Sequence, residues 1–268
     1  MRAVFASLIP GLHKGLVLLL LCLVSGVQTH AQGLNVDLAL VLAVDVSSSM
    51  TIEELGVQRA GYVAAIADPE VAEALRAGYF HRIALSYVEW ADPHQQVVTM
   101  PWRIIDGPIA AQAFAAELAA QPLTSGTNTA ISSGLLFAEK MFLNPPFQTD
   151  RRVIDVSGDG PNTAGPHVAP VRDRIVVNWI VINGLPVVVG KSELAPGSTV
   201  TLESYYRDCV SGGPGAFVLP VTQADGMLSG IRRKLVLEIA GTEPQLITAS
   251  VIVPPKVDCT TGQKDFYE

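Results

Sequence analysis

Hydrophobic runs and amphipathic segments alternate along most of the chain. Residues 36–44 form an almost unbroken apolar run rich in β-branched side chains, which is typical of a strand buried on both faces of a parallel sheet. Residues 82–90 and 152–157 have the same character. After the first run, Thr51 and Glu54 are spaced as a capping box and predict a helix that stops at the Asp68-Pro69 step.

The other segments continue this alternation. Residues 95–102 form a strand joined to the run at 82–90 by Asp92-Pro93-His94, and so short a connection predicts an antiparallel pair at the sheet edge. Further strands are predicted at 179–182, resuming at 187–189, and at 216–220, and further helices at 109–120, 129–142, 168–176, 204–209 and 224–240. The pattern predicts an α/β fold: a doubly wound, mostly parallel open sheet with helices on both faces and one antiparallel edge strand.

The first 31 residues have a different character. Arg2 and Lys14 precede a short apolar run at residues 16–24, and small residues close the segment at Ala31, which indicates a secretory signal peptide at residues 1–31. A membrane anchor is the alternative, although the run is shorter than the ~20 residues that cross a bilayer. We therefore expect a secreted or periplasmic protein with no membrane insertion after cleavage.

Cleavage leaves one predicted domain at residues 32–241 and a C-terminal tail at 242–268. Cys209 and Cys259 remain, and in an exported protein the simplest interpretation is one disulfide that ties the tail to the domain; two free thiols are the alternative. The chain has 18 basic and 25 acidic residues, and cleavage removes two of the basic ones. This acidic balance argues against nucleic acid and anionic membranes as partners.

Polar side chains gather in three turns that follow predicted strands, where ligands of open α/β sheets bind. The first turn holds Asp45, Ser47 and Ser49 at alternating positions, the second holds Thr127 before a helix, and the third holds Asp159 between two glycines. Each turn alone is as easily a helix cap or an ordinary Asp-Gly turn. Together they offer two carboxylates and three hydroxyls, hard oxygen donors that suit Mg²⁺, Mn²⁺ or Ca²⁺.

This order of Asp-x-Ser-x-Ser, a distant threonine and a later Asp-Gly resembles the metal-ion-dependent adhesion site (MIDAS) of von Willebrand factor type A (VWA) domains. The segments RIALSYVEWA and RRVIDVSGDGPN further resemble a bacterial VWA-like family of unassigned function (DUF1194). The resemblance implies one divalent cation, most simply Mg²⁺, with the ligands Asp45, Ser47, Ser49, Thr127 and Asp159. The candidates for supporting these ligands are Thr129, Asp155 and Glu89. For Asp155, we favour a structural pair with Arg151 or Arg152.

The resemblance also implies a function. In VWA domains, a Glu or Asp of a protein partner completes the shell of the metal, which makes this chain a binding module and not an enzyme. A structural VWA-like domain with a non-functional site is one alternative, and a metal-dependent hydrolase or phosphatase is another. A phosphoaspartate mechanism calls for a second carboxylate where Ser47 stands, and no Gly-x-Ser-x-Gly elbow is present. The enzyme interpretation is therefore the weaker one.

Overall fold

The structure is a computed structural model that describes residues 33–188, 194, 200–222, 226–241 and 257–262. The predicted signal peptide and most of the predicted tail lie outside these residues and remain predictions. In the part of the chain that is described, no helix is long and apolar enough to cross a membrane. The described domain contains the disulfide between Cys209 and Cys259, with an S–S distance of 2.00 Å.

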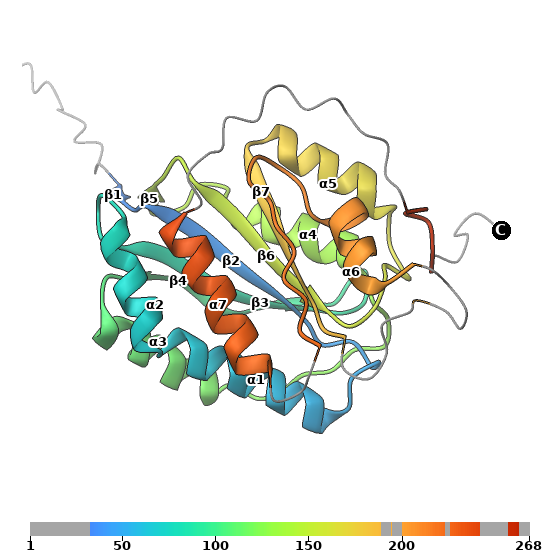
Figure 1. The fold of residues 1–268 in the computed structure, drawn as a ribbon, viewed down its shortest axis with the longest axis horizontal. Coiled ribbons are helices and arrows are strands. Elements are labelled where there is room, and N and C mark those ends of the chain that lie inside the picture. Colours follow the sequence, from blue (N-terminus) through green and yellow to red (C-terminus); the bar gives the residue numbers. More distant parts are fainter. Residues whose placement is uncertain (1–32, 189–193, 195–199, 223–225, 242–256, 263–268) are drawn as a thin grey trace, which may run out of the picture. The chain divides into compact units, whose positions relative to one another are not determined.

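A five-stranded sheet in the order β4-β3-β2-β6-β7 lies at the centre of the domain (Figure 1). Its strands are β2 (Leu38–Asp45), β3 (Ile83–Trp90), β4 (Gln96–Ile105), β6 (Arg152–Gly158) and β7 (Ile180–Pro186). The edge strand β4 is antiparallel to β3, and the other neighbours are parallel. The predicted fold class is thereby confirmed. A separate parallel pair of β1 (Leu34–Asn35) and β5 (Phe147–Gln148) was not predicted.

Helices cover both faces of the sheet (Figure 1). One face carries α1 (Ile52–Ile66), α2 (Pro69–Ala74), the short η1 (Leu75–Ala77), α3 (Pro108–Ala119) and α7 (Met227–Ala240). The other carries α4 (Ile131–Lys140), α5 (Val168–Val177), α6 (Leu202–Tyr205) and the π-helical turn η2 (Tyr206–Val210). Every residue of the central strand β2 is buried, because its side chains alternate between these two layers.

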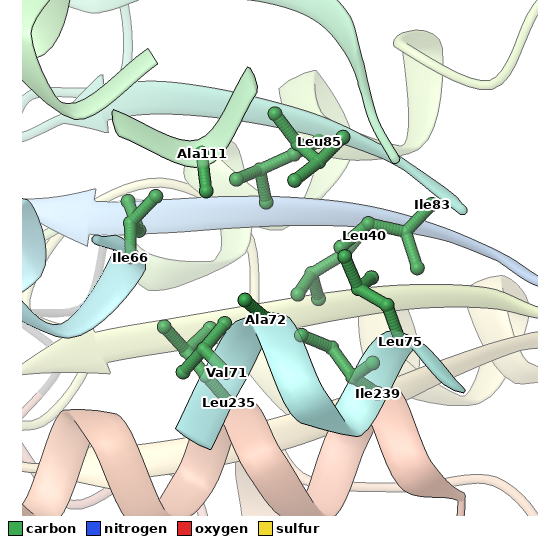
Figure 2. A pocket seen from close by; sticks show the side chains of 11 residues that line it. Leu40, Ile66, Val71, Ala72, Leu75, Ile83, Leu85, Ala111, Leu235 and Ile239 are labelled. Atoms are coloured by element: carbon green, nitrogen blue, oxygen red, sulfur yellow. The ribbon is translucent and has the colours of Figure 1, made fainter. Parts of the chain in front are cut away.

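The layer between the sheet and α7 is apolar under α2. Figure 2 shows a pocket there that is lined by aliphatic side chains of β2, β3, α1, α2, η1 and α7 together with Ala111 of α3. Ile105 of β4 also lines it. Such a lining provides packing area but no hydrogen-bond donor, acceptor or charge. Polar side chains that could bind a ligand gather instead at the carboxyl ends of the strands.

Several predicted boundaries were wrong for identifiable reasons. The Asp68-Pro69 step ends α1, but Asp68 also accepts from the backbone N–H of Glu70 and caps α2, with the proline in its first turn. Strand β7 runs without the predicted break through Asn183 to Pro186, since a proline is tolerated where the strand ends. The predicted strand at 216–220 forms only isolated bridges in the described chain.

Candidate metal site

Strand β2 brings Asp45 to the edge of the sheet and buries it completely. The backbone N–H of Ser47 donates to Oδ1 of Asp45 at 2.8 Å, and Nε2 of Gln58 on α1 donates to its backbone carbonyl at 2.9 Å. The backbone N–H of Gly126 donates to the carbonyl of Val46 at 2.8 Å. The loop after β2 is therefore fixed on one side by α1 and on the other by the loop that leads to α4.

A chain of side-chain hydrogen bonds joins the three loops. Thr129 Oγ1 donates to Ser47 Oγ at 3.2 Å, and Ser47 Oγ lies 3.0 Å from Ser49 Oγ. Ser49 Oγ in turn donates to Oδ1 of Asp159 at 2.6 Å. The structure thus brings together four of the residues singled out from the sequence, and Asp45 is bonded to the same loop. We call these five residues the oxygen cluster: Asp45, Ser47, Ser49, Thr129 and Asp159.

The hydroxyl of Thr127 forms its hydrogen bond outside the oxygen cluster, although the resemblance implies that Thr127 is a metal ligand. Its Oγ1 donates to Oδ1 of Asp92 at 2.8 Å, and its backbone N–H donates to Oδ2 of the same aspartate at 2.9 Å. Asn128 Nδ2 also donates to Asp92. In this arrangement Thr129, and not Thr127, has its hydroxyl beside Ser47. Asp92 was not singled out from the sequence, although it follows a strand end, β3, as Asp45 and Asp159 do.

Glu89 lies outside the oxygen cluster. It forms a buried ion pair with Arg59 and accepts a hydrogen bond from Thr124 Oγ1 at 2.8 Å. Arg59 also donates to the backbone carbonyl of Leu118 at 3.1 Å, so that the pair joins α1, β3 and the end of α3. In this structure Glu89 therefore serves packing of the helical layer and does not add a third carboxylate to the cluster.

Asp155 points to the other face of the sheet. It pairs there with Lys234 of α7, which also pairs with Glu238 at 2.7 Å. The favoured pairing with Arg151 or Arg152 was wrong. Alternation turns Arg152 to the opposite face, and Arg151, although on the face of α7, is four residues or about 13 Å away along the strand, whereas Lys234 of α7 contacts Asp155. Arg151 donates to the backbone carbonyl of Glu238 and Arg152 to that of Asn178.

The electrostatics of the oxygen cluster are unfavourable as it stands. Burial, and next the charge of Asp159, raises the pKa of Asp45 to about 8; burial likewise raises the pKa of Asp159. Neither carboxylate takes part in an ion pair of the described chain. Oδ2 of Asp45 is buried without a hydrogen-bond partner among the described residues. A cation beside these oxygens would satisfy both the charge and the free oxygen.

The residue types also fit a hard cation. Among the described residues, no three His, Cys, Asp or Glu side chains gather into a group that could hold a metal, so a cation here would depend on hydroxyl and water oxygens as well as on the two carboxylates. The oxygen cluster supplies two carboxylates and three hydroxyls. Such a set suits an ion that keeps some of its water, as Mg²⁺ does.

Solved structures share this fold. Proximal thread matrix protein 1 (PTMP1) from the mussel byssus matches 78% of this chain and 48% of its own, with a TM-score of 0.55 and 10% identity. The pilus adhesin SpaC from Lactobacillus rhamnosus GG matches 78% of this chain and 31% of its own, with a TM-score of 0.54 and 13% identity. One PTMP1 structure, with a TM-score of 0.52, 13% identity and coverage of 78% of this chain and 49% of its own, is described with a zinc-occupied MIDAS motif.

The chain thus spans about half of the mussel protein and about a third of the adhesin, and at these identities the likeness shows the fold alone. No curated protein matches the chain. A family model described as "Protein of unknown function (DUF1194)" matches residues 35–243, which is most of the chain. With the sheet order, the helices on both faces and these structural neighbours, the chain belongs to the DUF1194 family and has a VWA-like fold.

Proposed function

We propose that this chain is an exported binding module that holds one divalent cation, most simply Mg²⁺, in the oxygen cluster. Asp45, Ser47, Ser49 and Asp159 are the ligands or bind through water, and the fifth position falls to Thr129. The observation that carries the proposal is the free, buried Oδ2 of Asp45 in a cluster of oxygens that has no cation from the protein. Such a group is stabilised by an ion supplied from outside.

The second part of the proposal concerns the partner. The five proposed ligands fill five of the six positions that Mg²⁺ prefers, so one position is open to a further oxygen. Ser48, Ser49 and Thr127 are exposed at the surface of the cluster, which gives a partner access to it. We propose that an Asp or Glu of a protein partner fills this position. The pilus adhesin among the structural neighbours supports a binding role for a domain of this fold.

No reaction is proposed for the site. The Oγ atoms of Ser47 and Ser49 contact each other, Thr129 and Asp159, and this set resembles a ligand shell rather than a nucleophile held by a base. The cation would supply an electrophilic contact point for a carboxylate, and the residues of the chain would orient it.

Calorimetric titration of the purified exported chain with Mg²⁺ tests the metal site. Thr129→Val and Thr127→Val form a matched pair, since each replaces one hydroxyl by a methyl in the same loop. We expect wild type to bind one ion and Thr129→Val to bind it more weakly, while Thr127→Val retains the affinity. If Thr127→Val lowers the affinity for Mg²⁺ more than Thr129→Val does, Thr127 and not Thr129 is the fifth ligand. If wild type binds none of Mg²⁺, Mn²⁺ and Ca²⁺, the proposal is refuted.

Partner recognition has its own test. The Mg²⁺-loaded chain is immobilised and exposed to the secreted and surface proteins of the organism that produces it. We expect a partner that is released by chelator, is not retained by Ser47→Ala, and is lost after its carboxylates have been converted to amides. Retention that ignores both chelator and amidation would exclude the proposed carboxylate contact.

A further inference from the structure

Tyr206 lies directly behind the oxygen cluster. It is the first residue of η2, it is fully buried, and its hydroxyl has no hydrogen-bond partner among the described residues. Oδ2 of Asp45 is the second buried polar atom without a partner in this region. Buried polar groups are almost always hydrogen-bonded, so two unsatisfied oxygens in one place require an explanation.

The two oxygens lie close together. A β-carbon built on Gly158 would lie 2.7 Å from the Tyr206 hydroxyl oxygen and 2.8 Å from Oδ2 of Asp45. The two oxygens are therefore at most about 5.5 Å apart, a separation that a small shift or one bridging water can span. The Tyr206 hydroxyl keeps its proton as a donor, because burial, and next the charge of Asp45, raises its pKa well above the ordinary value.

Two glycines create the slot that Tyr206 occupies. A β-carbon on Gly184 would lie 2.8 Å from Cδ1 of the Tyr206 ring, as that on Gly158 would from the hydroxyl. Gly184 pairs with Val156 in the register of β6 and β7, so the two glycines lie on the same face of neighbouring strands. Any other residue at either position would close the slot.

We infer that Tyr206 is a positioning residue of the metal site: its hydroxyl donates a hydrogen bond, directly or through one water, to Oδ2 of Asp45. This bond holds the carboxylate in the orientation in which it meets the cation. The aromatic ring of Tyr206 is enough to fill the slot, and a phenylalanine would fill it equally well. The hydroxyl needs a different reason, and the carboxylate of Asp45 provides one. Partners of this kind fix the orientation of metal ligands in other proteins. The inference rests on the proposed function.

The test compares Tyr206→Phe with Tyr62→Phe in the full exported chain. Tyr62 is also fully buried, but its hydroxyl donates to Ser157 Oγ at 3.0 Å on the opposite face of the sheet. Each variant loses one buried hydroxyl and nothing else. We measure the Kd for Mg²⁺ by calorimetry, the Tm of the metal-free protein, and the tyrosine ultraviolet difference spectrum produced by Mg²⁺.

For Tyr206→Phe we expect the Kd to rise about 10- to 100-fold, as for other groups that support metal ligands. In the metal-free protein this hydroxyl has no hydrogen-bond partner among the described residues, so its removal should lower the Tm less than removal of the Tyr62 hydroxyl. The tyrosine difference spectrum should be absent from Tyr206→Phe and retained by Tyr62→Phe. Tyr62→Phe should keep the Kd of wild type and lose metal-free stability, since it leaves Ser157 without its donor.

Three results would overturn the inference. A wild-type Kd in Tyr206→Phe would refute it while leaving the proposed function intact. Equal weakening in both tyrosine variants would show a general effect of lost stability. A wild type that binds none of the divalent cations would refute the proposed function, and the role of Tyr206 with it.

Discussion

Two groups of buried carboxylates lie close to strand β6 and differ in one respect. At the middle of the strand, Asp155 and Glu238 share the ammonium group of Lys234, and Asn183 Nδ2 donates to Glu238 at 3.0 Å. At its end, Asp159 and Asp45 have hydroxyl and backbone donors but no cation of the protein. The first group has a cation within the fold, although Oε2 of Glu238 has no hydrogen-bond partner among the described residues, whereas the second group has no cation from the described chain. On the proposed function, the first group serves stability and the second serves binding.

The largest expected effect comes from removing the internal cation. Lys234→Met leaves Asp155 and Glu238 buried beside each other without a positive charge, and we expect a loss of about 3–5 kcal/mol in the free energy of unfolding. Unfolding by denaturant measures it, and Lys140→Met on the exposed side of α4 is the control. A loss no greater than in this control would show that the two groups do not differ as described.

The opposite result is expected at the oxygen cluster. Burial raises the pKa of Asp45 to about 8, so its carboxyl is largely protonated at pH 7 in the metal-free protein; Asp45→Asn, which is neutral and of the same shape, should leave the metal-free protein at least as stable as wild type. Wild type should gain about 2.7 kcal/mol in Mg²⁺ at 100 times its Kd, and the variant should gain little. Thermal unfolding with and without chelator gives both values. A metal-free Asp45→Asn that is clearly less stable would mean that this carboxylate supports the fold.

The buried carboxyls of both groups have raised pKa values and make stability depend on pH, and the contribution of Glu238 can be removed by substitution. The pKa of Glu238 is raised from 4.5 to about 7 by burial and then by Asp155, so the folded protein retains a proton that the unfolded chain releases. Stability should therefore fall as the pH rises from about 4.5 to 7, by up to about 1.4 kcal/mol per pH unit. Glu238→Gln should reduce this slope without abolishing it, because Asp45 and Asp159 also retain protons, and the exposed Glu117→Gln should not change it. An unchanged slope in Glu238→Gln would assign the proton to another group.

The smallest effect is expected at Asp92, which holds the second loop of the site in place. Asp92→Asn weakens the bonds to Thr127 and Asn128 at a partly exposed position, and we expect a loss of about 1 kcal/mol or less in global stability. Hydrogen exchange should nevertheless quicken at residues 125–129 and stay unchanged in β2. Equal protection in both proteins would show that the loop is held by other contacts.

The sequence predicts those parts of the molecule that depend on neighbours along the chain. The apolar run of β2 identified the central strand, and Thr51 and Glu54 form the capping box that their spacing indicates. The loops with Asp45, Ser47, Ser49 and Asp159 meet because the ends of parallel strands share one edge of the sheet.

Other features depend on contacts that spacing does not encode. Asp92, which belongs to another loop, accepts the hydrogen bond of the Thr127 hydroxyl, and the hydroxyl of Thr129 is the one that lies beside Ser47. The slot for Tyr206 needs two glycines that only the pairing of β6 and β7 brings side by side. The ion pair of Asp155 with Lys234 likewise joins residues far apart in the chain. Their roles in binding a metal remain predictions.

The disulfide has a consequence for the unfolded protein. Cys209 and Cys259 are 50 residues apart, and the covalent ring that they close contains the whole of α7, with Lys234 and Glu238. A ring of this size reduces the conformational entropy of the denatured chain by the equivalent of about 4 kcal/mol in simple polymer theory. When the domain unfolds with the disulfide intact, the segment of α7 thus stays tethered to the segment of η2, and it refolds from within a closed covalent ring. The disulfide forms in an oxidising compartment. There the segment of α7 would sample fewer positions before Lys234 pairs with Asp155.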